Sequence, residues 1–176
     1  MNSQRNEVMK KKNDQLDNKE NKTGILVVDD HPVVRQGLTS LINLESDLVV
    51  CAQAENAAQA LEVIEKERVD LAIVDISLGG TNGIRLTEQI KSTHPHLPVL
   101  ILTIHSEALY AERALQAGAR GYVNKHEAAE TIIAAIRLIL SGKEYYNTTI
   151  REFLKRRHPE GSRCDVTDLA AECQKS

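Results

Sequence analysis

The sequence is poor in large aromatic side chains, with no Trp, one Phe and four Tyr among 176 residues. Hydrophobic residues still make up 41% of the chain, which is enough for one ordinary domain with extensions. The core of such a domain must therefore be built mainly from aliphatic side chains.

Cysteine is also scarce, and the three cysteines (Cys51, Cys164 and Cys173) include no C-x-x-C pair. An odd count without that spacing suits a reducing compartment better than a disulfide scaffold. No stretch approaches the roughly 18 apolar residues of a membrane span, and the N-terminus lacks the apolar core of a signal peptide. We therefore expect a soluble cytoplasmic protein with no membrane partner.

Positive charge is lacking in the middle of the chain. The net charge of the whole sequence is −3, but residues 24–150 carry ten Lys and Arg against sixteen Asp and Glu, a balance of about −6. That segment has no electrostatic footprint for nucleic acid, so we expect no direct nucleic-acid binding. Residues 1–23 are polar and rich in Lys and Asn, which predicts a flexible tail.

From Gly24 onward, short apolar runs alternate with segments whose apolar residues recur at helical spacing. The runs are ILVV (25–28), LVVCA (48–52), LAIV (71–74), VLILT (99–103) and GYVN (121–124). Continuous apolar strands separated by amphipathic helices predict a parallel sheet covered on both faces. Five such units with right-handed crossovers make an α/β, doubly wound (βα)5 fold.

Helix boundary signals agree with this pattern. Pro32 suits a first helical turn, and His31 before it is interpreted as a helix-start residue rather than a ligand. Predicted N-caps are Asn56, Asn82 and Ser106, and predicted helix stops are Gly118 and Gly142.

Polar residues follow the apolar runs. Asp29 and Asp30 come after the first run, Asp75 follows the third, Thr103 ends the fourth, and Lys125 follows the fifth. The second run offers no charge and is the natural outer strand. In open α/β sheets, ligands bind outside the carboxyl ends of the strands, so these side chains should converge there.

Three converging carboxylates repel one another, and a divalent cation removes that conflict. Mg²⁺ prefers oxygen ligands and suits phosphate chemistry. Thr103 and Lys125 could hold phosphoryl oxygens, and Asp75, alone on a central strand, could act as a nucleophile and become an aspartyl-phosphate. Each residue alone has an ordinary structural explanation, such as a cap, a strand residue or a surface charge; the joint pattern favours the site.

The motifs ILVVDDHPVVRQGL, LAIVDISLGGTNGI, VLILTIHSE and ALQAGARGYVNK resemble the receiver domain of bacterial two-component response regulators, most closely the NarL/FixJ subfamily. The resemblance covers about residues 24–145. It implies a flavodoxin-like five-stranded sheet of order 2-1-3-4-5. It also implies Mg²⁺-dependent phosphoryl transfer from a sensor histidine kinase, in a protein that is a switch rather than an enzyme beyond its own phosphorylation and dephosphorylation.

The resemblance implies a role for each matching residue. Asp75 matches the phospho-accepting aspartate and is also one of the expected Mg²⁺ ligands. Asp30 matches the main acidic Mg²⁺ ligand, and Asp29 a second acidic residue that acts partly through water. Ser77 matches the position whose backbone carbonyl completes the metal site.

Three further positions match the switch. Thr103 matches the hydroxyl that turns toward the phosphoryl group, and Lys125 the lysine that pairs with phosphate. Tyr122 matches the aromatic residue whose side chain swings inward on activation.

The sequence departs from the family pattern near the site. The loop SLGGTNG lacks the Pro that the family often carries there, and Lys125 is followed by His126 instead of Pro, so no cis peptide is assumed. Ile104 is bulkier than the small residue of many receivers. Ser77, Ile104 and His105 border the site and are candidates for tuning dephosphorylation.

The end of the chain leaves alternatives open. Relatives of this subfamily usually continue into a helix-turn-helix domain, whereas only 30 residues follow Tyr146 here. The segment NTTIREFLKRRH predicts one short helix, so residues 146–176 are interpreted as a linker and tail without a complete DNA-binding domain. The chain is then either a stand-alone receiver or a truncated transcriptional regulator. In either case a homodimer is a possible assembly.

An aspartyl-phosphate phosphatase is a weaker alternative. Such enzymes use an Asp-x-Asp pair, whereas Asp29 and Asp30 are adjacent and cannot both point the same way from a strand. An NTPase is weaker still, because the sequence has no G-x-x-x-x-G-K-[ST] motif.

Overall fold

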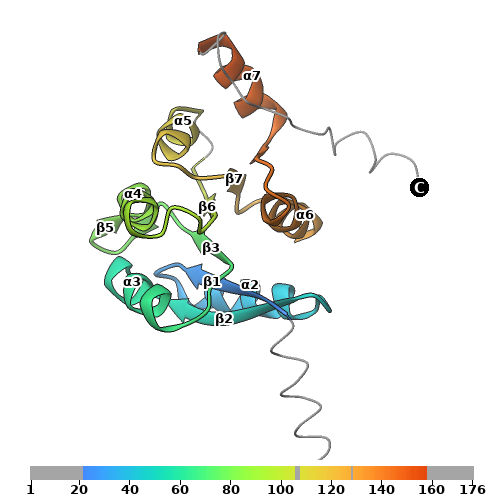
Figure 1. Ribbon diagram of the computed structural model, residues 1–176. Coiled ribbons are helices and arrows are strands. Elements are labelled where there is room, and N and C mark those ends of the chain that lie inside the picture. The colour runs from blue at the N-terminus through green and yellow to red at the C-terminus, as the bar shows by residue number, and fades with distance from the viewer. Residues whose placement is uncertain (1–21, 106–107, 128, 158–176) are drawn as a thin grey trace, which may run out of the picture.

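The computed structural model describes residues 22–105, 108–127 and 129–157 (Figure 1). Its main strands are β1 (Thr23–Val28), β2 (Leu48–Ala54), β3 (Leu71–Val74), β6 (Val99–Thr103), β7 (Gly121–Asn124) and β8 (Tyr145–Tyr146). A small hairpin is formed by β4 (Ser77–Leu78) and β5 (Thr81–Asn82). The helices are α2 (Pro32–Asn43), α3 (Ala57–Lys66), α4 (Gly83–Thr93), α5 (Ala108–Gln116), α6 (Ala129–Leu140) and α7 (Thr148–Arg157).

The strand order is β2-β1-β3-β6-β7-β8, and every pair in this sheet is parallel. Its first five strands reproduce the predicted order 2-1-3-4-5, so the flavodoxin-like fold is confirmed. A sixth strand is present beyond the five predicted, because β8 pairs with the outer side of β7. It was missed because two tyrosines make no apolar run.

Helices cover both faces of the sheet (Figure 1). Successive strand side chains point to opposite faces, and β1 shows this alternation directly. Ile25 and Val27 pack in the cluster that contains side chains of α2 and α6, whereas Leu26 and Val28 pack in the cluster of α3, α4, α5 and α7. Because both faces are covered, β1 reads as a continuous apolar run, while β2 at the edge is only partly buried.

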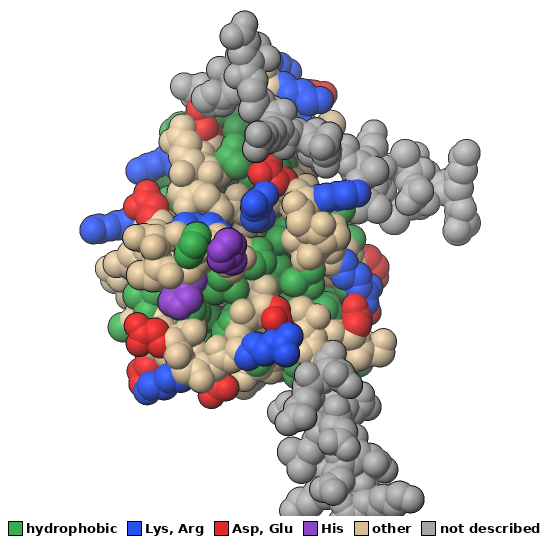
Figure 2. Space-filling model, viewed as in Figure 1, with side chains coloured by type: hydrophobic (Ala, Val, Ile, Leu, Met, Phe, Trp, Pro, Cys, Tyr) green, Lys and Arg blue, Asp and Glu red, His purple; other side chains and the backbone are tan. Residues whose placement is uncertain are grey.

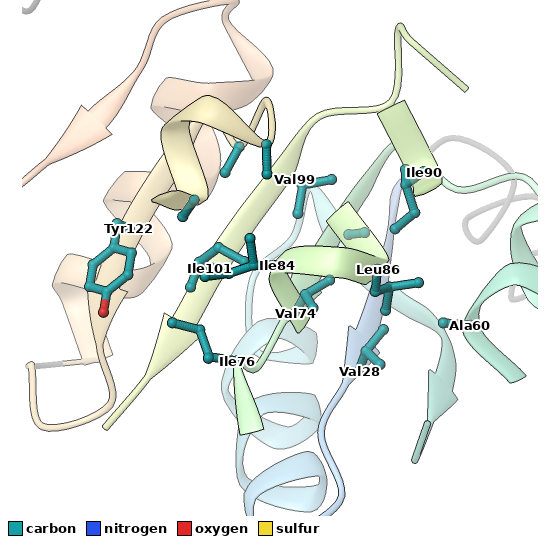
Figure 3. Close-up of a cluster of buried hydrophobic side chains, with 14 of the residues drawn as sticks. Val28, Ala60, Val74, Ile76, Ile84, Leu86, Ile90, Val99, Ile101 and Tyr122 are labelled. Carbon is teal, nitrogen blue, oxygen red and sulfur yellow. The ribbon is translucent and has the colours of Figure 1, made fainter. Parts of the chain in front are cut away.

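The core is aliphatic except for two tyrosines. Figure 3 shows valine, isoleucine and leucine side chains of several elements in one cluster, with the ring of Tyr122 at its side. Tyr122 and Tyr146 are the largest fully buried side chains. Each has a hydrogen bond for its hydroxyl, since Tyr122 donates to the carbonyl of His105 (2.7 Å) and Tyr146 to that of Ala119 (3.2 Å).

The predicted helix boundaries hold within the described residues. Pro32 lies in the first turn of α2. The side chains of Asn56 and Asn82 accept hydrogen bonds from the backbone N–H groups that begin α3 and α4. Gly118 and Gly142 follow α5 and α6 with φ of +93° and +86°, a conformation that favours glycine. Ser106 lies outside the described residues.

Helix α7 packs against α5, as Figure 1 shows at the top of the view. The side chain of Asn147 accepts from the N–H of Ile150 at the start of α7. Ile150 and Leu154 are buried in the same cluster as the small residues Ala111 and Ala114 of α5. The helix predicted in this segment is therefore part of the packed body.

The surface seen in Figure 2 mixes Lys and Arg side chains with Asp and Glu side chains around an apolar centre. Interspersed charges of both signs are typical of a solvated surface. Among the helices that the structure describes, none has the length and hydropathy needed to cross a membrane.

Candidate metal centre

The carboxyl ends of four strands bring the predicted polar residues to one edge of the sheet. Asp29 and Asp30 follow β1, Asp75 follows β3, Thr103 ends β6, and Lys125 follows β7. Three of these side chains are buried, since the exposed fraction is 2% for Asp29, 3% for Asp75 and 0% for Thr103. Burial of the two aspartate charges requires specific partners for Asp29 and Asp75.

The strand register holds these residues together. Val28 pairs with Val74, and the N–H of Asp75 donates to the carbonyl of Val28 at 2.9 Å. On the other side of the site, the N–H of Lys125 donates to the carbonyl of Thr103 at 2.8 Å. Residues at adjacent strand ends are therefore neighbours despite their separation in sequence.

Lys125 links two of the carboxylates. Its Nζ lies 2.6 Å from Asp29 Oδ2 and 2.9 Å from Asp75 Oδ2, and the side chain is only 12% exposed. Burial by itself would lower the pKa of Lys125, but the hydrogen bonds that its ammonium donates to Asp29 and Asp75 outweigh this effect, and the pKa is raised overall. The ammonium therefore stays charged and offsets part of the negative charge.

The remaining carboxylate oxygens fit a divalent cation. Asp30 Oδ1 and Asp75 Oδ1 are buried and accept no hydrogen bond within the described part of the chain. Ligand atoms of Asp29, Asp30, His31 and Asp75 all lie within 4.8 Å of one another. Buried carboxylate oxygens that converge without donors suit a hard, oxygen-preferring ion such as Mg²⁺.

His31 also belongs to this cluster, although the sequence interpretation placed it only at the start of a helix, where the structure also has it. It is the N-cap of α2 but makes no side-chain capping bond. Its N–H donates to Asp29 Oδ1 (2.8 Å), and its Nδ1 lies 2.6 Å from Asp30 Oδ1, although without the geometry of a hydrogen bond. The imidazole is largely exposed, so it stands at the rim. Its position beside the two aspartates was the only sequence signal.

The β4–β5 hairpin lies next to the acidic residues. The N–H of Gly79 at its tip donates to Asp30 Oδ2 at 3.1 Å. At the hairpin's end, a Cβ on Gly83 would stand 1.9 Å from the carbonyl oxygen of Asp75, so only glycine fits. Neither glycine was singled out from the sequence, although the loop SLGGTNG marked the segment.

The candidate tuning residues Ser77, Ile104 and His105 follow β3 and β6, the strands that carry Asp75 and Thr103 to the site. The hydroxyl of Ser77 and Nε2 of His105 are 3.2 Å apart, so the loops after β3 and β6 touch. Ile104 is 58% exposed. No contact among the described residues tests whether the Ser77 carbonyl binds a metal ion, so its role as a ligand stays a prediction.

The switch candidates form a chain of contacts. The hydroxyl of Thr103 accepts from the N–H of His105 at 3.4 Å, and the carbonyl of His105 accepts from the hydroxyl of Tyr122. The side chain of Tyr122 is buried in this structure. Thr103 is thus connected to Tyr122 through a single backbone residue. All described peptide bonds are trans, including that between Lys125 and His126.

The family model of the response regulator receiver domain matches residues 25–137 of the chain, well over half of its length. The chain belongs to this family. The Fimbriae Z protein of Salmonella typhimurium (strain LT2) is 36% identical over 81% of this chain. The aligned stretch spans 68% of that relative and 56–61% of two others.

Solved structures of the family have the same fold. A LuxR-family response regulator from Aurantimonas sp. SI85-9A1 is 32% identical, with a TM-score of 0.73 over 79% of this chain and 99% of that one. The signal receiver domain of the putative regulator NarL from Mycobacterium tuberculosis is 30% identical, with a TM-score of 0.66 over 69% of this chain and 98% of that one. The predicted resemblance to the NarL group is confirmed.

Family membership establishes the coarse features of this receiver. Receiver domains are in general regulators rather than enzymes, and they bind Mg²⁺ at an acidic pocket. They interact with histidine kinases and often dimerise. The phosphatase and NTPase alternatives are therefore disfavoured.

Proposed function

We propose that this protein is the phospho-acceptor of a two-component phosphorelay, and that Asp75 receives a phosphoryl group from a sensor histidine kinase. The observation that carries the proposal is the burial of Asp75 and the different contacts of its two carboxylate oxygens. Its side chain is buried at the end of a central strand, with Oδ2 held by Lys125 and Oδ1 accepting no hydrogen bond. A carboxylate oriented through one oxygen has the other available for reaction.

The chemistry balances within this site. An Asp75 oxygen attacks the phosphorus of a phosphohistidine, the new O–P bond forms as the P–N bond breaks, and the kinase histidine leaves. Lys125 is placed to pair with the transferred group, and Thr103 offers a hydroxyl. Asp29, Asp30, Asp75 and the Ser77 carbonyl would hold Mg²⁺, which when bound supplies neutralising charge at the phosphoryl oxygens.

The output step uses the contacts beside the site. Phosphorylation adds roughly −1.5 to −2 charge at Asp75. If Thr103 turns toward that charge, its hydrogen bond from His105 is lost, and His105 is also the partner of Tyr122. The change at Asp75 then reaches the side chain of Tyr122, and the population of two surface conformations shifts.

We assign this switch to residues 24–145, with residues 1–23 as a tail and residues 146–176 as a short C-terminal helix and tail, of which α7 packs on α5. The proposal places it in the cytoplasm, with a sensor histidine kinase as donor and a second copy of the chain as a possible partner. Transcriptional output would belong to the larger proteins of which receivers of this family form a part.

The test is phosphorylation with a small donor. Wild-type protein incubated with acetyl phosphate and Mg²⁺ should gain one phosphoryl group that is stable in acid and labile in base, as an acyl phosphate is. Asp75→Asn should abolish the adduct, which mass spectrometry detects.

The matched control is Asp70→Asn, at the opposite end of β3. Asp70 accepts from the N–H of Gly24 and lies away from the carboxyl edge, so this variant should be phosphorylated like the wild type. An adduct that survives Asp75→Asn would overturn the assignment of the acceptor.

Ile104 provides a test of access to the acceptor. We expect its bulky exposed side chain to restrict water, so that Ile104→Ala shortens the half-life of the phosphorylated protein. Leu109→Ala is the control, because Leu109 has a similar exposure (55% against 58%) but lies on α5. The decay of the mass adduct measures both, and equal half-lives for Ile104→Ala and wild type would exclude gating by this residue.

A further inference from the structure

The side chain of Asn124 joins the loop that follows β6 to the turn that follows β7. Its Nδ2 donates to the carbonyl of Ile104 at 3.3 Å, and its Oδ1 accepts from the N–H of His126 at 2.9 Å. Asn124 is also the partner of Thr103 in the register of β6 and β7. Both polar atoms of this amide therefore tie together two segments at the carboxyl edge, beside the switch hydroxyl.

The bond to Ile104 fixes the peptide group that holds the hydroxyl of Thr103. The carbonyl of Ile104 and the N–H of His105 belong to one peptide bond, which is planar and trans, so the two groups point in opposite directions. The carbonyl accepts from Asn124, and the N–H donates to Thr103 Oγ1 at 3.4 Å. A donor that orients one end of this peptide group therefore orients the other end as well.

We propose that Asn124 is a positioning residue of the switch, which holds the peptide between Ile104 and His105 in the orientation that pairs its N–H with Thr103. The inference rests on the proposed function, because that function requires Thr103 to turn toward a phosphoryl group on Asp75. Asn124 then stabilises the conformation that precedes this turn.

The turn of Thr103 weakens the bond to Asn124 for a geometric reason. When the hydroxyl leaves, the N–H of His105 loses this acceptor, and a backbone donor without a partner is costly. A rotation of the peptide that gives the N–H a new acceptor also moves the carbonyl of Ile104 away from Asn124. A contact that exists in only one of two conformations favours that conformation by its own free energy, so Asn124 opposes the switched state.

The two ends of the Asn124 amide can be separated by substitution. Its Oδ1 bond to the N–H two residues on is an Asx turn, which a serine hydroxyl also makes, although more weakly. The donor to Ile104 is lost in Asn124→Ser, because the serine side chain is one bond shorter than the amide. This variant therefore removes the link between the loops without any change of charge beside Lys125.

The test is the affinity of the full chain for beryllofluoride with Mg²⁺, a mimic of a phosphoryl group on an aspartate. Titration followed by NMR should show that Asn124→Ser binds about 2–10-fold more tightly than wild type, the effect of one hydrogen bond made only in the unswitched state. His126→Ala is the matched control, since it changes an exposed side chain of the same turn and keeps the N–H that Asn124 accepts, and it should bind like wild type.

Equal or weaker binding by Asn124→Ser, or the same gain in His126→Ala, would overturn the inference. A purely structural role of Asn124 would not tighten binding. A wild type that binds no beryllofluoride would instead contradict the proposed function. If Asn124→Ser does not fold, the wild type decides, because the Nδ2 protons of Asn124 should exchange more slowly with solvent in the free protein than in the beryllofluoride complex. Exchange that is equally slow in both would contradict the role of Asn124.

Discussion

Lys125 is the residue that makes two buried carboxylates compatible with the fold. Asp29 and Asp75 are almost fully buried, and both depend on its ammonium. Removing one partner of a buried ion pair leaves an uncompensated charge, which is more costly than never having had the pair. The loss of stability on removal of the Lys125 ammonium can therefore be measured without any phosphoryl donor.

We expect Lys125→Met to lower the free energy of unfolding by about 3 kcal/mol in EDTA at pH 7, the scale for breaking a buried pair. Urea denaturation measures it. Lys66→Met, at an exposed ion pair on α3, should remain close to wild type. A loss no larger than that of Lys66→Met would contradict the pairing.

The pH dependence has a definite sign. The pKa of Lys125 is raised in the folded protein, so its contribution is fully present below the ordinary value of about 10.5 and is lost as the pH rises through the folded value. The difference in the free energy of unfolding between wild type and Lys125→Met should therefore stay constant from neutral pH to about pH 10 and become smaller only above it.

At the scale of elements, β8 and α7 extend the sheet and cover one helix. Pairing of Tyr145 with Gly121 continues the sheet, and Leu154 of α7 is buried in the cluster that also holds Tyr122. Tyr122, the predicted switch residue, and α7 therefore share one core. A movement of the Tyr122 side chain would therefore change the packing of α7.

We expect Leu154→Ala to destabilise the protein by about 2–4 kcal/mol, the range for removing a buried leucine side chain. Lys155→Ala, at the next and exposed position of α7, should leave urea denaturation near wild type. A loss below about 1 kcal/mol would mean that α7 is not packed in solution as in the structure.

For the whole molecule, metal binding and folding are one linked equilibrium. The acidic residues come from two segments of the chain, Asp29 and Asp30 after β1 and Asp75 after β3, so their arrangement exists only in the folded state. A ligand that binds only that state stabilises all of it. The ion should therefore affect global stability as well as phosphorylation.

We expect Mg²⁺ at 100 times its dissociation constant to raise the free energy of unfolding by about 2.7 kcal/mol, and EDTA to reverse the gain. Asp30→Asn should lose most of this increment at the same concentration, while Asp70→Asn should keep it. Thermal or urea unfolding with and without Mg²⁺ decides, and an equal increment in Asp30→Asn would exclude Asp30 as a ligand.

The sequence by itself determined the sheet and the residues at its edge. The first five strands of the sheet could be recognised as apolar runs, because a strand covered on both faces has no polar side. Asp29, Asp75 and Lys125 could be grouped because each directly follows its own strand, and parallel strands end at the same edge.

Only the tertiary structure decided the contacts between loops. The bond from Gly79 to Asp30, the approach of Ser77 to His105 and the place of His31 depend on where loops come to lie, which hydrophobic periodicity does not encode. The same holds for β8 and for the packing of α7 on α5. Their positions follow from long-range packing around a core that exists only once the sheet has formed.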